Sequence, residues 1–205
     1  MKIGIMGGTF NPPHMGHLNA ATAAKENIPL DKLILIPAGI PPHKKMAENS
    51  ASVEQRLEMT KLCAEEIGAE VSDVEIRREG KSFTVDTLAH FRSVYPDDEL
   101  WLIMGTDMFL TVETWRRAEE ILENTCIAAV PRNDGDFEKL LEHSEFLREK
   151  YGARTRIINV EAVTISSTEL RPDVEDEKSL NFLPERVRRY IAENKLYCNP
   201  EDEAE

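Results

Sequence analysis

The chain lacks the features that suit a protein to a membrane or to a nucleic acid. No apolar run approaches the roughly 20 residues that a membrane-spanning helix requires, and the N-terminus has no secretory signal pattern. Positive charge is scarce, with 25 Lys and Arg against 38 Asp and Glu and a formal net charge of -13. Binding to a nucleic-acid backbone needs a basic surface. We therefore expect a cytoplasmic protein that binds neither a membrane nor a nucleic acid.

Cysteine is also scarce. Cys63, Cys126 and Cys198 are odd in number and far apart, and none belongs to a CxxC pair, so neither a disulfide framework nor a zinc site is expected. The remaining composition, 41% apolar and 31% charged, is typical of a globular protein. The length favours one domain over two. We expect that domain to span residues 1–198 and the acidic residues 199–205 to be a disordered tail.

Short runs of Ile, Leu and Val alternate with longer helical patterns. The expected strands cover residues 2–6, 33–37, 71–76, 100–104, 126–130 and 156–160. The expected helices cover residues 18–26, 53–67, 84–95, 115–122 and 137–151, and a further helix begins at Pro184 in a C-terminal helical part of about 165–198. Such alternation predicts an α/β fold with a doubly wound, mostly parallel sheet.

The first loop carries two histidines three residues apart. It reads Gly7-Gly8-Thr9-Phe10-Asn11-Pro12-Pro13-His14-Met15-Gly16-His17. A helix starting near Met15 would place both imidazoles on one face at its N-terminus, where the helix dipole favours an anion. A dinucleotide-binding turn is the weaker reading, because GxGxxG is absent. Two unrelated surface histidines are the other alternative.

A second candidate anion site follows the last expected strand. It reads Ile165-Ser166-Ser167-Thr168-Glu169-Leu170-Arg171, a hydroxyl-rich turn that opens a helical pattern. Ser and Thr are favoured N-caps, and a guanidinium suits phosphate oxygens. The same four residues SSTE also fit a plain capping box.

Together the two segments resemble the GxFxPxHxGH and ISSTxxR signatures of the nucleotidyltransferase superfamily, which has a Rossmann-like fold. The resemblance implies that His14 and His17 stabilise charge at the α-phosphate of ATP and that Arg171 holds the β- and γ-phosphates. It also implies further ATP contacts, at Gly7, Gly8, Thr9, Phe10, Ile165, Ser166 and Ser167. Asn11 stands where many relatives have Asp, which leaves the role of its side chain open.

Three further segments bear on the second substrate. The loop Pro41-Pro42-His43-Lys44 offers Lys44 as a phosphate clamp, or as a solvated lysine. In Ser82-Phe83-Thr84, a hydroxyl either caps the following helix or faces the substrate. Gly105-Thr106-Asp107 ends an expected strand, a usual place for ligands in open α/β sheets, and Asp107 suits a ribose. Trp115 fits either the core or a stacking position on a pyridine ring.

These segments, with Pro184, Val187, Tyr190 and Ile191, resemble bacterial nicotinate-nucleotide adenylyltransferases over nearly the whole chain. In that family the TVDTL threonine and the aromatic near Trp115 hold the nicotinate nucleotide, and the GTD aspartate serves the ATP ribose. The resemblance assigns those roles to Thr84, Trp115 and Asp107, with Gly105 beside Asp107. Phe83 replaces a commoner Tyr. Arg132 either faces the nicotinate nucleotide, or Pro131-Arg132 is only the point at which the chain leaves the sheet.

The resemblance implies that the 5′-phosphate of nicotinic acid mononucleotide attacks the α-phosphorus of ATP in line, without a covalent intermediate. Catalytic roles then fall to His14, His17, Lys44 and Arg171. Mg²⁺ is expected to bind through the ATP phosphates, with no protein ligand, because Mg²⁺ commonly keeps substrate oxygens and waters. The alternatives are nicotinamide mononucleotide or phosphopantetheine as acceptor, or a non-catalytic nucleotide sensor. Relatives are often homodimers, but the sequence does not determine the oligomeric state.

Overall fold

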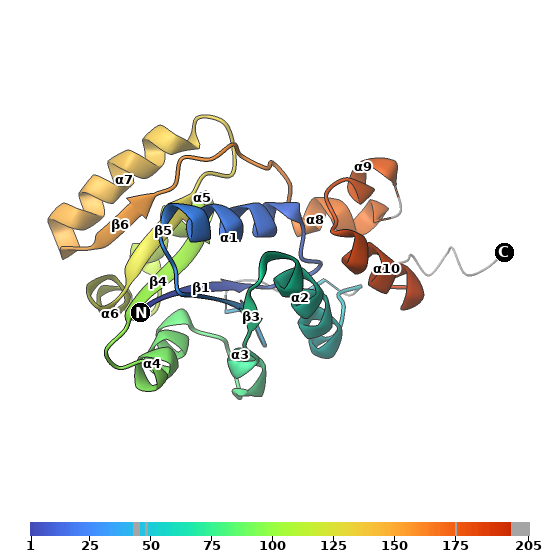
Figure 1. Cartoon of the computed structure of the whole chain (residues 1–205), viewed down its shortest axis with the longest axis horizontal. Helices are drawn as coiled ribbons and strands as arrows, with labels where there is room; N and C mark the ends of the chain where they lie inside the picture. The colour runs from blue at the N-terminus through green and yellow to red at the C-terminus, as the bar shows by residue number, and fades with distance from the viewer. Residues whose placement is uncertain (43–45, 48, 175, 198–205) are drawn as a thin grey trace.

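The protein is described by a computed structural model in which residues 1–42, 46–47, 49–174 and 176–197 are placed. Six parallel strands form one sheet, in the order β3-β2-β1-β4-β5-β6 (Figure 1). The strands are β1 (Lys2–Gly8), β2 (Lys32–Pro37), β3 (Glu70–Val71), β4 (Glu99–Gly105), β5 (Cys126–Val130) and β6 (Arg154–Ile157). This order is that of the doubly wound Rossmann-like folds. The predicted α/β fold class is therefore confirmed.

Helices follow the strands in the expected alternation. The longer ones are α1 (Met15–Asn27), α2 (Val53–Ile67), α4 (Thr84–Val94), α6 (Ala118–Asn124), α7 (Asp136–Tyr151) and α10 (Glu185–Glu193). The short ones are α3 (Val74–Arg77), α5 (Thr106–Phe109), η1 (Val112–Thr114), α8 (Ser167–Leu170), η2 (Arg171–Asp173) and α9 (Glu177–Leu180). Local sequence fixes several ends: Ser52 and Gln55 form a capping box before α2, and Gly68 ends it in a left-handed conformation.

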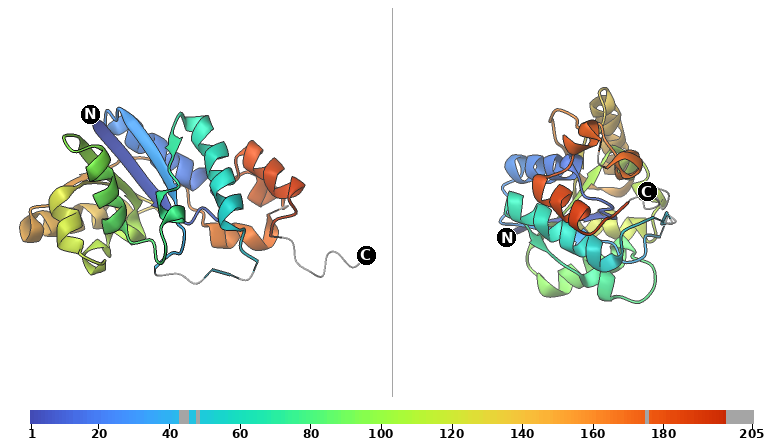
Figure 2. Two further views of the ribbon diagram at one scale, coloured as in Figure 1. Left: turned by 90° about the horizontal axis from the view of Figure 1, so that it is seen from below. Right: turned by 90° about the vertical axis from the view of Figure 1, so that its right-hand side faces the viewer.

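Three apolar clusters hold the layers together. One face of the sheet packs against α4 to α7, and the other packs against α1 and α2. The alanine-rich α1 lies opposite α4 across the sheet (Figure 1). A third cluster joins α2 to the C-terminal helices, so α10 lies beside α2 at one end of the molecule (Figure 2). The C-terminal segment is thereby brought to the carboxyl end of β1.

Several predicted elements were wrong in extent; α1, expected over 18–26, begins at Met15. Only Glu70 and Val71 pair with β2, because Asp73 starts the helical turn α3, in which its carbonyl accepts from two N–H groups and its carboxylate pairs with Arg77. Strand β6 begins at Arg154 rather than 156, since it is an edge strand with alternating polar residues. Helix α6 begins at Ala118 rather than 115, because Arg117 has a left-handed backbone that cannot lie inside a helix.

The core is expected to be sensitive to truncation at α7. Leu147 is fully buried between α7 and the sheet, so Leu147→Ala should lower the free energy of unfolding by about 2 to 5 kcal/mol. Leu141 lies on the same helix and is 45% exposed. Leu141→Ala should change stability by no more than about 0.5 kcal/mol. Urea unfolding of both variants tests this expectation, and equal losses would contradict the packing described.

Candidate active site

A cavity of about 470 Å³ opens at the carboxyl ends of the central strands. Its lining comes from many parts of the chain, among them the first loop, the segment after β2, the start of α4, the end of β4, residues 115–116, the segment after β5 and the second turn. The predicted site residues that line it are Gly7, Gly8, Thr9, Phe10, His14, His17, Thr84, Gly105, Trp115, Arg132, Ile165, Ser166 and Ser167. The structure thus brings most of the candidates to one place.

His14 and His17 cap the start of α1 reciprocally. The Gly16 N–H donates to Nδ1 of His14, and the His14 N–H donates to Nδ1 of His17, both at 3.2 Å. The two ring centroids lie 3.9 Å apart. Because Nδ1 accepts a hydrogen bond in each ring, the neutral imidazole carries its proton on Nε2. The cap therefore fixes the tautomer of both histidines.

The backbone N–H groups at the start of α1 already have partners. The Met15 N–H donates to the Phe182 carbonyl, and the Gly16 N–H is used by His14. An anion at this helix end would therefore meet imidazole donors and the helix dipole rather than these two N–H groups. A side chain at Gly16 would approach the His14 ring to 3.0 Å, so glycine leaves room for that ring.

His14 is almost fully buried, at 3% exposure. Burial first, and then the positive charge of Arg132, lowers the pKa of its imidazole to about 3. The ring is consequently neutral in the ligand-free protein at neutral pH.

The two signature turns meet directly. The Ser167 hydroxyl donates to the Pro12 carbonyl at 2.9 Å, and Nη1 of Arg171 donates to the Asn11 carbonyl at 2.9 Å. These contacts join segments more than 150 residues apart in the chain. The convergence of the two turns, on which the sequence interpretation depends, is what the structure shows.

The second turn is also a helix cap. The Ser166 hydroxyl accepts from the Glu169 N–H, which makes Ser166 the N-cap of α8, and it also contacts the Glu169 carboxylate. A full capping box would instead have this carboxylate accept from the Ser166 N–H. Ser166 and Ser167 also line the cavity. Arg171 differs from expectation: its guanidinium donates to Asn11, Ser167 and Thr168. Within the described ranges, Arg171 does not line the cavity.

The Asn11 side chain does not belong to the described cavity lining and connects three segments. Its side-chain oxygen accepts from the Ala51 N–H and from the Tyr197 hydroxyl, and its amide donates to Ser50. Asn11 is 3% exposed, and the Asn11–Pro12 peptide bond is cis. Its side chain thus fixes the loop to residues 50–51 and to the C-terminal segment, which settles the question left open by the sequence.

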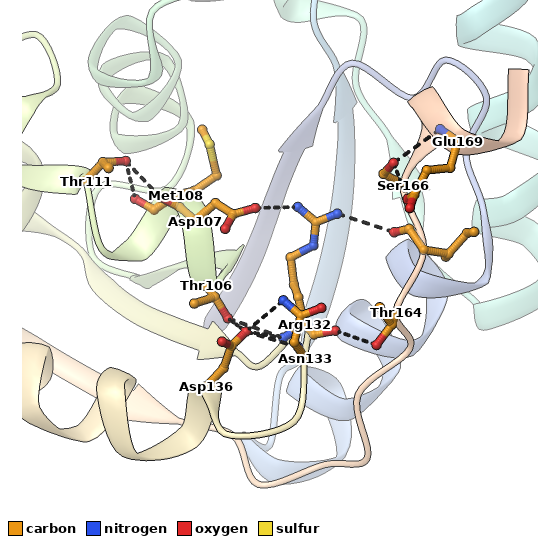
Figure 3. A network of polar contacts seen from close by, with 11 residues as sticks. Thr106, Asp107, Met108, Thr111, Arg132, Asn133, Asp136, Thr164, Ser166 and Glu169 are labelled. Carbon is orange, nitrogen blue, oxygen red and sulfur yellow. Dashed lines mark hydrogen bonds and ion pairs between the residues drawn. The ribbon is translucent and has the colours of Figure 1, made fainter.

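Arg132 connects the turn after β4, which carries Asp107, to the second turn, which begins with Ile165 (Figure 3). Nη1 donates to the Asp107 carboxylate at 2.8 Å, and Nη2 donates to the Ile165 carbonyl at 3.3 Å. A side chain at Gly105 would meet Cδ of Arg132 at 2.8 Å, so glycine is needed beneath it. Arg132 therefore faces the site rather than leaving the sheet. Asp107 is exposed and, among the placed residues, is not part of the cavity lining.

Asp136 holds the turn that carries Arg132. Its carboxylate accepts from the Thr106 hydroxyl at 2.7 Å and from the backbone N–H groups of Arg132 and Asn133 (Figure 3). Burial opposes ionisation of Asp136, but these hydrogen bonds outweigh it and lower the pKa of the carboxyl group. The charged form is therefore favoured, and it anchors the turn.

Trp115, Phe83 and Thr84 form an aromatic end of the cavity lining. Trp115 also packs on the core, and its stacking on a pyridine ring stays a prediction. Neither Ser82 nor Thr84 caps α4: Phe83 is the N-cap residue, and the Ser82 hydroxyl instead accepts from the Gly39 N–H. Lys44 lies outside the described residues.

Among the cavity residues that sequence reasoning missed, three carry polar groups at or near the aromatic end. Arg116 lines the aromatic end, with its guanidinium 4.5 Å from the centroid of the Phe83 ring. Glu75 and Thr87 lie deeper, and the Thr87 hydroxyl donates to the Glu75 carboxylate at 2.7 Å. Burial raises the pKa of Glu75 against the hydrogen bonds from Thr87 and Ser82 and the charge of Arg78. Glu75 was missed because it was assigned to a strand. Arg116 could have been found from its position directly after the candidate Trp115.

In the described part of the chain, no three His, Cys, Asp or Glu side chains gather in a way that would hold a metal ion. The polar groups in the described cavity lining are mainly imidazoles, hydroxyls and guanidinium groups, with the Glu75 carboxylate beside them. Binding of Mg²⁺ through the ATP phosphates stays a prediction. Across the same residues, no helix has the length and apolar character needed to cross a membrane.

The sequence is similar to a known family over most of its length. Residues 5–172 match the family described as cytidylyltransferase-like. The chain is 40% identical to a protein of Desulfitobacterium hafniense (strain DSM 10664 / DCB-2), covering 96% of this chain and 95% of that one. It is 38% identical to a protein of Lachnoclostridium phytofermentans, covering 96% and 98%. Both relatives are named "Probable nicotinate-nucleotide adenylyltransferase".

Solved structures share the fold. A nicotinic acid mononucleotide adenylyltransferase of Plasmodium falciparum, in complex with NaAD, superposes with a TM-score of 0.78 at 16% identity. The match covers 96% of this chain and 97% of that one. At such low identity this likeness supports the fold alone. The sequence matches carry the assignment: the chain belongs to the cytidylyltransferase-like family and, within it, to the nicotinate-nucleotide adenylyltransferases.

Proposed function

We propose that the protein transfers the AMP part of ATP to the 5′-phosphate of nicotinic acid mononucleotide, forming nicotinic acid adenine dinucleotide and pyrophosphate. The observation that carries this function is the meeting of the two signature turns at one cavity. The names of the relatives agree with it. They do not favour a nicotinamide or phosphopantetheine acceptor, or a nucleotide sensor without activity. A cytoplasmic location and a homodimer stay predictions.

The site suits direct transfer between two phosphates. The attacking phosphate oxygen is already ionised, so the reaction needs no general base; the protein must hold two anions together and stabilise the charge that develops. His14 and His17 carry Nε2 protons on cavity-lining rings, as a hydrogen bond to a phosphate oxygen requires. Mg²⁺ would enter as part of the MgATP substrate, held by its phosphate oxygens.

Arg132 and Asp107 are predicted ligands of different substrates, and in this structure they bind each other. Substrate binding would exchange this exposed ion pair for contacts to phosphate and ribose. An exposed ion pair of this kind contributes little to stability, so breaking it on substrate binding costs little free energy.

The position of Arg116 supports a nicotinate nucleotide, rather than a nicotinamide nucleotide, as the acceptor. Its guanidinium lies against Phe83 at the aromatic end of the cavity, where a pyridine ring would stack on Trp115. In the described chain, Arg116 has no hydrogen bond or ion pair, whereas the adjacent Arg117 pairs with Asp86 and Glu120. A ring carboxylate would supply the missing counter-charge, and a ring amide would not.

Replacement of a histidine should lower turnover strongly. Removing one preorganised donor to a developing negative charge typically reduces the rate by about 10² to 10³, so His17→Ala should lower kcat by that factor. The measurement is pyrophosphate release from ATP, Mg²⁺ and nicotinic acid mononucleotide. His90 is exposed on α4, and His90→Ala serves as the control with unchanged kcat. Near-normal turnover of both His14→Ala and His17→Ala would refute the assigned roles.

Loss of the Arg116 charge should change acceptor choice. Arg116→Gln should lower the ratio of kcat/KM for nicotinic over nicotinamide mononucleotide by about tenfold, the value of one partly exposed charge-assisted contact. Arg116→Lys should keep most of the preference. Arg117→Gln is the matched control, because Arg117 has its own acidic partners. A ratio that is the same in Arg116→Gln and wild type would exclude Arg116 as the source of specificity.

The lowered pKa of His14 has a consequence for stability. Between pH 6.5 and about 3, the unfolded chain binds a proton that the folded protein does not, so the free energy of unfolding falls as the pH falls. His14→Asn replaces the Nδ1 cap by a side-chain oxygen that can also cap the helix, and it removes the titrating group. Its unfolding free energy should therefore fall less steeply, by up to about 1.4 kcal/mol per pH unit. Urea unfolding at pH 7, 6, 5 and 4.5 measures the slopes, and equal slopes would contradict a neutral, buried His14.

A further inference from the structure

A buried guanidinium lies behind the first loop. Arg56, in the first turns of α2, is 1% exposed. Its Nη1 donates to the Thr9 carbonyl at 2.8 Å and to the Ala38 carbonyl at 2.7 Å, and its Nη2 donates to the Gly39 carbonyl at 3.2 Å. One planar group thus binds three backbone oxygens.

These oxygens belong to the segments that leave two neighbouring strands. Thr9 follows β1 and starts the histidine loop, whereas Ala38 and Gly39 follow β2 and lead toward the Pro41-Pro42-His43-Lys44 segment. Thr9 and Ala38 both line the cavity. Arg56 therefore fixes the segment expected to hold ATP relative to the segment that leads to the expected acceptor clamp.

The position is not one that stability alone would favour. Among the residues that the structure describes, no carboxylate pairs with Arg56, and its buried Nε has no hydrogen-bond partner. A buried charge without a counter-charge is destabilising, and a partly satisfied one remains so. The planar guanidinium instead fixes the relative positions of the three carbonyl groups that it binds, because its donors are held in a rigid fork.

We infer that Arg56 is a positioning residue for adenylyl transfer: without touching either substrate, it sets the distance between the histidine loop and the segment after β2 that begins with Ala38 and Gly39. The inference rests on the proposed function. In-line attack requires the two phosphates to be aligned closely, and a misplacement of about 1 Å by a distant residue can lower the rate by about 10²-fold. Arg56 is thus expected to act on turnover more than on binding.

Arg56→Lys tests the inference, because lysine keeps the charge and loses the fork. We expect kcat, measured by pyrophosphate release at 15 °C, to fall by about 10- to 100-fold. The KM values for ATP and for nicotinic acid mononucleotide should each stay within about threefold of wild type, since each substrate keeps its own contacts. Circular dichroism and a thermal melt establish that the variant is folded at the assay temperature.

Met59→Ala is the matched control. Met59 is fully buried on the same helix and packs on the C-terminal cluster, away from the cavity. Its truncation should lower Tm at least as much as Arg56→Lys and leave kcat at 15 °C near the wild-type value. A similar loss of kcat in Met59→Ala would show that general destabilisation explains both variants, and it would overturn the inference.

The remaining outcomes are also decisive. Unchanged kcat in folded Arg56→Lys, or a change in KM alone, would overturn the positioning role. If neither Arg56→Lys nor Arg56→Gln folds at any temperature, Arg56 is purely structural. Absence of pyrophosphate release by the wild-type protein with nicotinic acid mononucleotide would instead refute the proposed function, which separates the two failures.

Discussion

The site depends on two hydrogen bonds between distant parts of the chain. Ser167 and Arg171 donate to the carbonyls of Pro12 and Asn11, and both bonds measure 2.9 Å. They form because a parallel sheet brings the carboxyl ends of its strands to one edge, where the loop after β1 and the segment after β6 meet. The orientation of the two imidazoles and the shape of the cavity follow from the loop conformation that these bonds stabilise.

Much of the fold was predictable, because buried parallel strands are continuous apolar runs. The fully buried run Cys126–Val130 is β5 as expected, and α2 has the expected bounds because Ser52 and Gly68 mark its ends. The errors have local causes. Val71, Val74 and Ile76 suggested a strand over 71–76, but Asp73 starts a helical turn within it. No propensity rule places Arg117 in a left-handed conformation.

The residues of the site were predictable from the sequence, but the directions in which their side chains point were not. Spacing identified the histidine loop and the serine turn, and chain topology brought them together. A guanidinium, however, sits on a long flexible stem, so sequence does not determine which acceptor it selects. Arg171 turned to the backbone of the first loop, and Arg132 joined Asp107 to Ile165. The roles of these residues toward substrates stay predictions, and that of Lys44 lies outside the described chain.

The hydrogen bond from Tyr197 to Asn11 connects residues 186 positions apart. During synthesis on a ribosome, β1 and the histidine loop emerge well before Tyr197. The six strands of the sheet end at Ile157 and so precede Tyr197 as well. The sheet can thus begin to assemble early, but the loop at its edge acquires this brace only after residue 197 has been made. Competence to hold a nucleotide is consequently a late event in the life of each new molecule.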